Sequence, residues 1–454
     1  MALKHTAIAV LLLAALAGCA SVEVQQPAAA TSAYSAAFTE AQALAQGHAA
    51  LSGPARSANA GRIEALLAGL DDAALARDAA RLPVGDPLYS FAGRALLNRG
   101  LPLPRPFDRG DVSFGAADRP AADRDGYRPP LKVGVLLPLS GGQSAAAASV
   151  RDGFLAGYYG ERRRRPELRF YDTATGASAA YARAAAEGND FVVGPLARDE
   201  VDAVFADETP SVPLLALNRG SRTPPAGSAA FSLSPEDEGI SIAQYLIQRG
   251  AKQVLVIQGG DDAQRRIATA ARTQLQQRGV RVTASLDYRE DMAAALRQAV
   301  QAEGGVDMLL LSLKGSQARA LVPQLAAAGL SATPRVATSQ IVSGTGKPAE
   351  DAVLDGIVYP TESWGVRGVD GLPSQASAAA RVDTAKGPAA RLFAFGYDAW
   401  LLTGYLERLA LSNNGDIAGA TGRLGLDGFG NVLRVPGWSR FAGGVSVPLA
   451  DGAR

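Results

Sequence analysis

The chain has 454 residues, of which 47% are hydrophobic and 20% charged, and this composition is ordinary for a globular protein with a sizeable core. The formal net charge is +1, so charge gives no indication of binding to nucleic acid or to a strongly acidic partner. One cysteine excludes an internal disulfide, and two histidines leave little material for histidine chemistry. Length alone predicts roughly two to three domains.

Residues 1–18 have the pattern of a secretory signal peptide. A basic start precedes an apolar run over residues 6–17, which is too short to cross a bilayer as a helix. The run ends in the letters LAGC, which resemble a bacterial lipobox, and Cys19 stands where that motif receives its lipid. We therefore expect cleavage before Cys19 and lipidation of its thiol. An ordinary signal peptide that contains a cysteine is the alternative.

The next two segments are predicted to be a tether and a group of helices. Residues 19–34 are small and polar and lack periodicity, which is typical of a flexible tether. Residues 35–105 are rich in alanine, carry apolar residues at helical spacing, and are divided by Gly and Pro into three or four short helices. No repeat period is evident. A remnant of a tetratricopeptide-type array and a helical stalk docked on the main domain both remain open.

Residues 106–130 are rich in Pro, Asp and Arg and are predicted to be a linker. Strand and helix patterns then alternate throughout residues 131–450. Strands are expected at 131–139, 168–172, 190–194, 212–217, 252–258, 280–286, 306–311, 335–338 and 356–360, and two short ones at 421–426 and 431–435. So many units exceed one doubly wound sheet. We therefore predict an α/β domain of two lobes, each with its own parallel sheet flanked by helices.

Several of these segments carry a family resemblance. The letters KVGVLLPLSG, DGFLAGYY, FYDT, DFVVGPLARDEV and FSLSPEDE resemble the type I periplasmic-binding-protein fold. Together with LDGIVYPTESW, FGYDAWLL and GATGRLGLDGFGNVLR, they are most similar to the C-terminal domain of the penicillin-binding protein activator (LpoA) lipoproteins. The resemblance covers residues 131–447. It implies a two-lobed periplasmic-binding-protein-like domain preceded by a short all-α region.

The resemblance also implies a function. Members of that family are outer-membrane lipoproteins that reach into the periplasm and stimulate a class A penicillin-binding protein, a peptidoglycan synthase, by direct contact. They have no catalytic activity of their own and need no cofactor. Ala20 follows the expected lipidated cysteine, where Asp would favour the inner membrane, so it agrees with the outer membrane. The family's N-terminal helical array is normally longer than the segment 35–105 found here.

The residues themselves argue against an enzyme. Residues 131–450 contain no histidine, which excludes a Ser-His-Asp triad or a histidine metal site there. The transpeptidase patterns Ser-x-x-Lys and Lys-Thr-Gly are also missing, so the chain is not itself a penicillin-binding transpeptidase. We predict no catalytic residue, metal or cofactor. A cell-wall hydrolase is the least favoured alternative.

A cleft between the lobes is the expected place for any ligand, because the carboxyl ends of parallel strands meet at one edge of a sheet. The candidate cleft residues are Ser140, Gly141, Gly142, Gln143, Gly194, Pro195, Asn218, Arg219 and Ser234. Each also has a simpler interpretation as a turn or helix-capping residue. A small ligand is therefore left open, and a solute-binding lipoprotein for an amino acid or similar molecule is the alternative function.

Two further groups have structural interpretations. The four arginines at 162–165 follow a predicted helix and are expected to be a solvated helix end, although an interaction patch is the alternative. The aromatic residues Tyr359, Trp364, Trp400 and Trp438 are expected in the core or in the wall of the cleft rather than on a partner surface.

Overall fold

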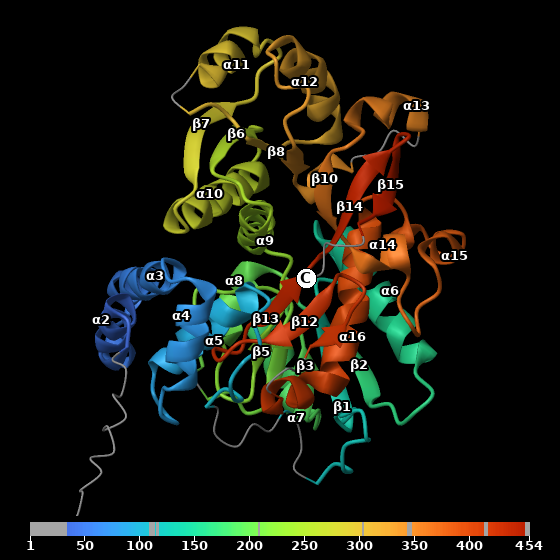
Figure 1. Cartoon of the computed structure of the whole chain (residues 1–454). Helices are drawn as coiled ribbons and strands as arrows, with labels where there is room; N and C mark the ends of the chain where they lie inside the picture. The colour runs from blue at the N-terminus through green and yellow to red at the C-terminus, as the bar shows by residue number, and fades with distance from the viewer. Residues whose placement is uncertain are drawn as a thin grey trace, which may run out of the picture. The chain divides into compact units, whose positions relative to one another are not determined.

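The computed structural model describes residues 34–108, 114, 118–207, 209–301, 304–342, 347–412 and 416–449. The predicted signal peptide, Cys19 and nearly all of the tether lie outside these residues. The chain divides into two units, Met1–Ser35 and Ala36–Arg454, and all the helices and strands below belong to the second (Figure 1). No helix in the described part of the chain is both long enough and apolar enough to cross a membrane.

An all-α segment comes first, as predicted. Its helices are α2 (Ala36–Gln46), η1 (His48–Ala50), α3 (Gly53–Ala68), α4 (Asp72–Ala80) and α5 (Leu88–Asn98). Phe38, Ile63 and Leu75 are fully buried among them. Two guanidinium groups hold the C-terminal end of α3, where carbonyl oxygens lack helical partners. Arg99 donates to the Leu67 and Leu70 carbonyls at 2.7 and 2.9 Å, and Arg278 donates to the Leu70 carbonyl at 3.0 Å.

The first lobe is built on five parallel strands in the order β2-β1-β3-β4-β5. They are β1 (Lys132–Leu137), β2 (Glu167–Asp172), β3 (Phe191–Val193), β4 (Leu214–Ala216) and β5 (Ala229–Ala230). The helices between them are α6 (Ser144–Gly160), α7 (Ala177–Ala186) and α8 (Arg198–Val204). The interior strand β1 is apolar and buried after its first residue, as expected for a strand covered on both faces.

The second lobe is built on seven strands in the order β15-β14-β10-β9-β8-β6-β7. The parallel strands are β6 (Gln253–Gln258), β7 (Arg281–Asp287), β8 (Met308–Ser312), β9 (Arg335–Ala337) and β10 (Val358–Thr361). The helices are α9 (Pro235–Gln248), α10 (Asp262–Gln277), α11 (Ala293–Val300) and α12 (Gly315–Ala327), followed by the short α13 (Pro348–Asp351). The predicted two-lobed α/β architecture is confirmed.

The end of the chain differs from the prediction. We expected the chain to close with strands near 421–426 and 431–435, which form β12 (Arg423–Leu426) and β13 (Val432–Val435) in a small sheet with β11 (Ile417–Ala418). The structure adds β14 (Gly437–Ala442) and β15 (Val445–Pro448), an antiparallel hairpin on the edge of the second sheet. Neither strand has a continuous apolar run, since β14 contains Ser439 and Arg440 and β15 is mostly exposed, so the sequence pattern did not reveal them.

One long helix, α16 (Ala389–Leu411), returns the chain from the second lobe to the first after α14 (Ser363–Arg367) and α15 (Gln375–Ala379). It packs against α6 so closely that the two backbones touch. A methyl group on Gly153 of α6 would overlap the Phe393 carbonyl, and one on Gly396 of α16 would overlap the Val150 carbonyl. Only glycine fits at either position.

The predicted linker is partly fastened to the same helix. Arg119 is 4% exposed and forms an ion pair with Glu407 of α16, and Arg128 reaches the same carboxylate at 2.8 Å. Tyr127 lies against Gly404 of α16, where a side chain larger than hydrogen would overlap its ring. Residues 118–130 therefore pack on the first lobe instead of crossing open solvent.

The arginines at 162–165 were predicted to be a solvated helix end, and this prediction holds in part. Arg162, Arg163 and Arg165 are exposed, and Arg165 donates to the Tyr158 carbonyl near the end of α6 at 3.2 Å. Two of the four also bind the segment before β1. Arg163 lies 3.8 Å from the Tyr127 ring and pairs with Asp125 at 2.9 Å. Arg164 donates to the Pro129 carbonyl at 3.0 Å. Arg163 and Arg164 thus bind residues 125–130, which lie more than thirty positions away in the sequence, so only the folded chain reveals these contacts.

Replacing Gly153 or Gly396 by Ala should destabilise the first lobe, because the added methyl group meets backbone that cannot move away as a side chain can. We expect a loss of about 1–3 kcal/mol or more and a matching fall in Tm, measured by circular dichroism. Gly142→Ala is the matched control, since nothing lies within 4 Å of a methyl group there. Equal Tm values for all three variants would contradict the proposed close approach.

Candidate functional site: the cleft between the lobes

A cavity of about 520 Å³ lies where the two lobes meet, and we call it the interlobe cleft. The first lobe contributes the loops that follow β3, β4 and β5, the second contributes the starts of α9 and α10, and α16 contributes Leu392 and Phe395. Three of the predicted cleft residues, Asn218, Arg219 and Ser234, line it. The candidates that line the cleft are thus the two that follow the fourth strand and the one that precedes α9.

All three residues form polar contacts with the protein, although the Arg219 Nε is buried without a partner among the described residues. The Asn218 amide donates to the Leu196 carbonyl at 3.0 Å. The Arg219 guanidinium pairs with Asp237 at 2.8 Å. Ser234 caps α9, since its hydroxyl accepts hydrogen bonds from the backbone N–H groups of residues 236 and 237. The capping interpretation of Ser234 is thus confirmed.

The carboxylate that lines the cleft, Glu236, is also paired with an arginine of the protein itself. Arg266 of α10 forms two hydrogen bonds with the Glu236 carboxylate, at 2.7 and 3.0 Å. Burial opposes ionisation of Glu236, but the hydrogen bonds from Arg266 and Ser234 outweigh it and lower the Glu236 pKa to about 2. The carboxylate therefore stays charged and paired at neutral pH. Arg198 is the exposed cation at the rim.

The other candidate residues do not line this cleft. Ser140 donates to the Asp172 carboxylate at 2.6 Å, and the hydrogen bond lowers the Asp172 pKa. A carboxylate of the protein itself thus occupies the hydrogen-bonding position that we considered for a ligand, while Gly141, Gly142 and Gln143 form the exposed turn into α6. Gly194 and Pro195 are joined by a cis peptide and are buried. Gly194 has φ = 105°, and a side chain there would overlap the Leu136 carbonyl.

A buried charged network behind the cleft was not predicted. Glu238 of α9 is 2% exposed and accepts from the backbone N–H of Ser339 at 2.7 Å. Arg391 of α16 pairs with Glu238 at 3.1 Å and with Glu362 at 3.2 Å. Burial opposes ionisation of Glu238, but Arg391 and Ser339 outweigh it and lower its pKa. The network ties α16 to the second lobe, and its members are too far apart in the sequence to form a local motif.

A second buried carboxylate on α16 holds the chain after β11. Asp398 is fully buried and accepts hydrogen bonds from the Ala420 and Thr421 N–H groups and from the Thr421 hydroxyl. Burial raises the Asp398 pKa to about 7, although these donors and Arg434 oppose the rise. Its role is structural, since it fixes the turn that leads into β12.

The four predicted core aromatics are buried, each by at least 96%, but they do not form one cluster. Tyr359 and Trp438 belong to different apolar clusters of the second lobe, and Trp400 lies in the core of the first lobe. Trp364 stacks on Phe393 in a separate cluster. In the described part of the chain, no group of three or more His, Cys, Asp and Glu side chains is arranged to hold a metal ion.

The raised pKa of Asp398 predicts a pH dependence of stability. The pKa is about 7 in the folded protein and about 4 in an unfolded chain, so the folded state binds more protons between these values. The contribution of Asp398 is therefore full below about pH 4 and is lost as the pH rises through 7. In thermal scans from pH 5 to 8, wild type should lose more Tm than Asp398→Asn. Parallel pH profiles would contradict the prediction.

The comparisons with known proteins agree with this structure. The family model described as "LppC putative lipoprotein" matches residues 127–444. The penicillin-binding protein activator LpoA of Photobacterium profundum is 27% identical over 362 residues, which cover 70% of this chain and 57% of that protein. The chain spans about half the length of the first curated relatives that it matches.

Two solved structures share the fold. The C-domain of LpoA from Haemophilus influenzae, described as a regulator of PBP1A, is 24% identical with a TM-score of 0.61, and the match covers 70% of this chain and all of that domain. A "putative branched-chain amino acid ABC transporter" from Chromobacterium violaceum is 28% identical with a TM-score of 0.56, covering 68% of this chain and all of that one. Since the family model spans well over half of the sequence and the fold agrees with it, the chain belongs to the LppC family of lipoproteins.

Proposed function

We propose that this protein activates a class A penicillin-binding protein in peptidoglycan synthesis by direct contact, as a lipoprotein of the outer membrane that faces the periplasm. The observation that carries the proposal is the match to relatives named penicillin-binding protein activator LpoA, which spans the two-lobed domain. The C-domain described as a regulator of PBP1A has the same fold along its whole length, which is consistent with the proposal.

The arrangement of the cleft fits a protein that acts by contact. Arg219 pairs with Asp237, and Glu236 pairs with Arg266. These ion pairs within the protein hold the shape of the cleft. An activator needs only to bind the active conformer of the synthase more tightly than the inactive one. Such binding uses surface, and it requires no reacting group in the activator.

Stimulation of a purified synthase tests the proposal. The full chain, made as Cys19→Ser so that no lipid is attached, would be mixed with a class A synthase and its lipid-linked precursor. We expect severalfold faster formation of polymerised and cross-linked glycan, because binding shifts the synthase toward its active conformer. The same protein after irreversible heat unfolding is the control. No binding and no stimulation would overturn the proposal.

The proposed lipid anchor has a separate test in cells. Cys19 follows a lipobox-like sequence, and acyl chains on its thiol would hold the protein at the membrane. We expect the wild-type protein in the outer-membrane fraction and Cys19→Ser in the soluble periplasmic fraction after cell lysis. Ala20→Asp should move the protein toward the inner-membrane fraction. A membrane-bound Cys19→Ser protein would contradict lipidation at this residue.

A solute-binding function is the second candidate. It is favoured by the volume of the interlobe cleft, which lies within the range of about 300–1,000 Å³ typical of small-molecule sites, and by the 28% identity to the Chromobacterium violaceum protein. A free amino acid such as leucine would then raise the Tm of the wild-type protein by mass action. Arg198→Glu at the rim of the cleft should abolish that rise.

A further inference from the structure

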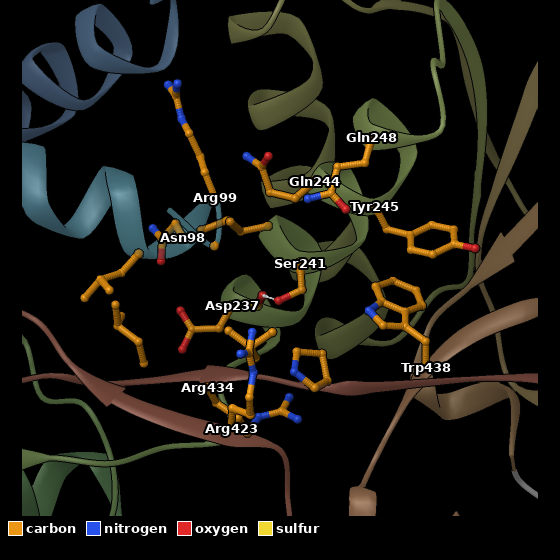
Figure 2. A pocket seen from close by; sticks show the side chains of 16 residues that line it. Asn98, Arg99, Asp237, Ser241, Gln244, Tyr245, Gln248, Arg423, Arg434 and Trp438 are labelled. Carbon is orange, nitrogen blue, oxygen red and sulfur yellow. Dashed lines mark hydrogen bonds between the residues drawn. The ribbon is translucent and has the colours of Figure 1, made fainter. Parts of the chain in front are cut away.

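A second cavity lies away from the interlobe cleft, at the junction of the helical segment and the α/β lobes (Figure 2). Its volume is about 200 Å³, enough for roughly seven waters or for one small organic molecule. The end of α5, one face of α9, and β13 with the start of β14 form its walls, so we call it the α5–α9 pocket. It shares no lining residue with the interlobe cleft.

The walls of the pocket are firmly held. Arg99, at the end of α5, is 8% exposed and is fixed by α3 carbonyls and by Asp72 at 3.0 Å. On the opposite side, Trp438 stacks on Tyr245 of α9 with 4.1 Å between ring centroids. Trp438 and Tyr245 are both at least 91% buried. The pocket is thus preformed, which lowers the entropic cost of binding.

A buried hydrogen-bond donor in the pocket has no partner. Gln244 of α9 is 7% exposed, and its side-chain nitrogen makes no hydrogen bond to the protein. Buried polar groups are nearly always paired, so an orphaned amide nitrogen indicates a missing acceptor. In Figure 2 the Gln244 side chain leaves α9 on the side of the pocket that faces Arg99.

The pocket also contains a cation without a direct counter-ion. Arg434 of β13 is 8% exposed, and its guanidinium donates to the Thr421 carbonyl at 3.1 Å. Among the described residues it forms no ion pair; Glu362, Glu238 and Asp237 act on it only from a greater distance. Burial lowers the Arg434 pKa, and the neighbouring Arg391 lowers it further, so the site would gain from a nearby negative charge.

The other charges that line the pocket are already paired. Asp237 binds Arg219 at 2.8 Å, and Arg423 binds Asp416 at 3.2 Å. The Ser241 hydroxyl donates to the Asp237 carbonyl at 2.8 Å. The side-chain nitrogen of Gln244 is therefore available to a ligand. The same pocket is lined by Arg434, which forms no ion pair among the described residues, and by the apolar Trp438 and Pro436.

We propose that the α5–α9 pocket binds a small carboxylate with an apolar body. The carboxylate would accept hydrogen bonds from Gln244 and Arg434, and the apolar body would lie against Trp438. Because the end of α5 forms one wall, the bound molecule would also contact the helical segment and the α/β lobes at once. The pocket shares no lining residue with the interlobe cleft, although a further cavity of about 260 Å³ is lined by Gln244 of the pocket and by Arg219 of the cleft. The proposal does not depend on the proposed activator function.

Binding of N-acetyl-leucine to the full chain with Cys19→Ser tests the proposal, with N-acetyl-leucinamide as the uncharged analogue. At millimolar concentration we expect the acid to raise Tm by about 1–3 °C and to change the tryptophan fluorescence in a saturable way. The amide should bind at least about tenfold more weakly, since it cannot pair its charge with Arg434. Trp438→Phe should lose most of the fluorescence change and keep the rise in Tm.

Three variants locate the site and keep the proposal falsifiable if one of them folds poorly. Gln244→Met removes a donor that has no protein partner, so the unliganded protein should stay as stable as wild type while the Tm rise is lost. Arg434→Met should also lose the rise. Arg198→Glu, in the interlobe cleft, should leave it unchanged. No response to the acid, equal binding of the amide, full binding by Gln244→Met, or loss of binding in Arg198→Glu would each overturn the proposal.

Discussion

The rest of the structure depends on the close crossing of α6 and α16. Gly153 and Gly396 let the two helix backbones touch, and this contact fixes the position of α16, to which the other parts of the structure are bonded. Successive turns of α16 then carry Arg391, which pairs with Glu238 of the second lobe, and Asp398, which holds the turn before β12. The last turns carry Glu407, which binds two arginines of the segment 118–130. A methyl group at either glycine would shift α16, and with it the ion pairs and hydrogen bonds that α16 forms with these other parts.

The interlobe cleft illustrates how inherited architecture and function can separate. In its position it is the cleft expected of a two-lobed α/β protein. Its charged groups Arg219, Glu236 and Arg266 are ion-paired, although the Arg219 Nε and the Ser232 hydroxyl are buried without a hydrogen-bond partner in the described part of the chain. The α5–α9 pocket contains the Gln244 side-chain nitrogen, which is buried without an acceptor, and the Arg434 guanidinium, which donates to the Thr421 carbonyl but forms no ion pair among the described residues. Each cavity therefore has a buried polar group without a partner, which is costly, and in the α5–α9 pocket that group lies at the junction with the helical segment.

The helical segment is bonded directly to the second lobe. Arg99 from α5 and Arg278 from the end of α10 meet at the last carbonyls of α3 and at Asp72, so the second lobe contributes directly to capping a helix of the first segment. Positive charge at a helix C-terminus is favourable because the backbone carbonyls there carry partial negative charge. This junction supports the interpretation of residues 35–105 as a docked helical segment, and it makes the geometry of the α5–α9 pocket dependent on that docking.

The sequence by itself determined most of the strands and the class of fold, but not the closing hairpin of β14 and β15. Apolar runs predicted the buried strands, because side-chain periodicity is set by local backbone geometry. It also predicted that Ser234 caps a helix, a local interaction. Only the tertiary structure decided which charges are paired: Arg119 meets Glu407 across 288 positions, and the exposed Arg163 meets Asp125 across 38. It also decided that Ser140 binds Asp172 rather than facing a ligand. The physical reason is that a long charged side chain takes its partner from whatever lies within a few ångströms after folding, and sequence distance carries no information about that neighbour.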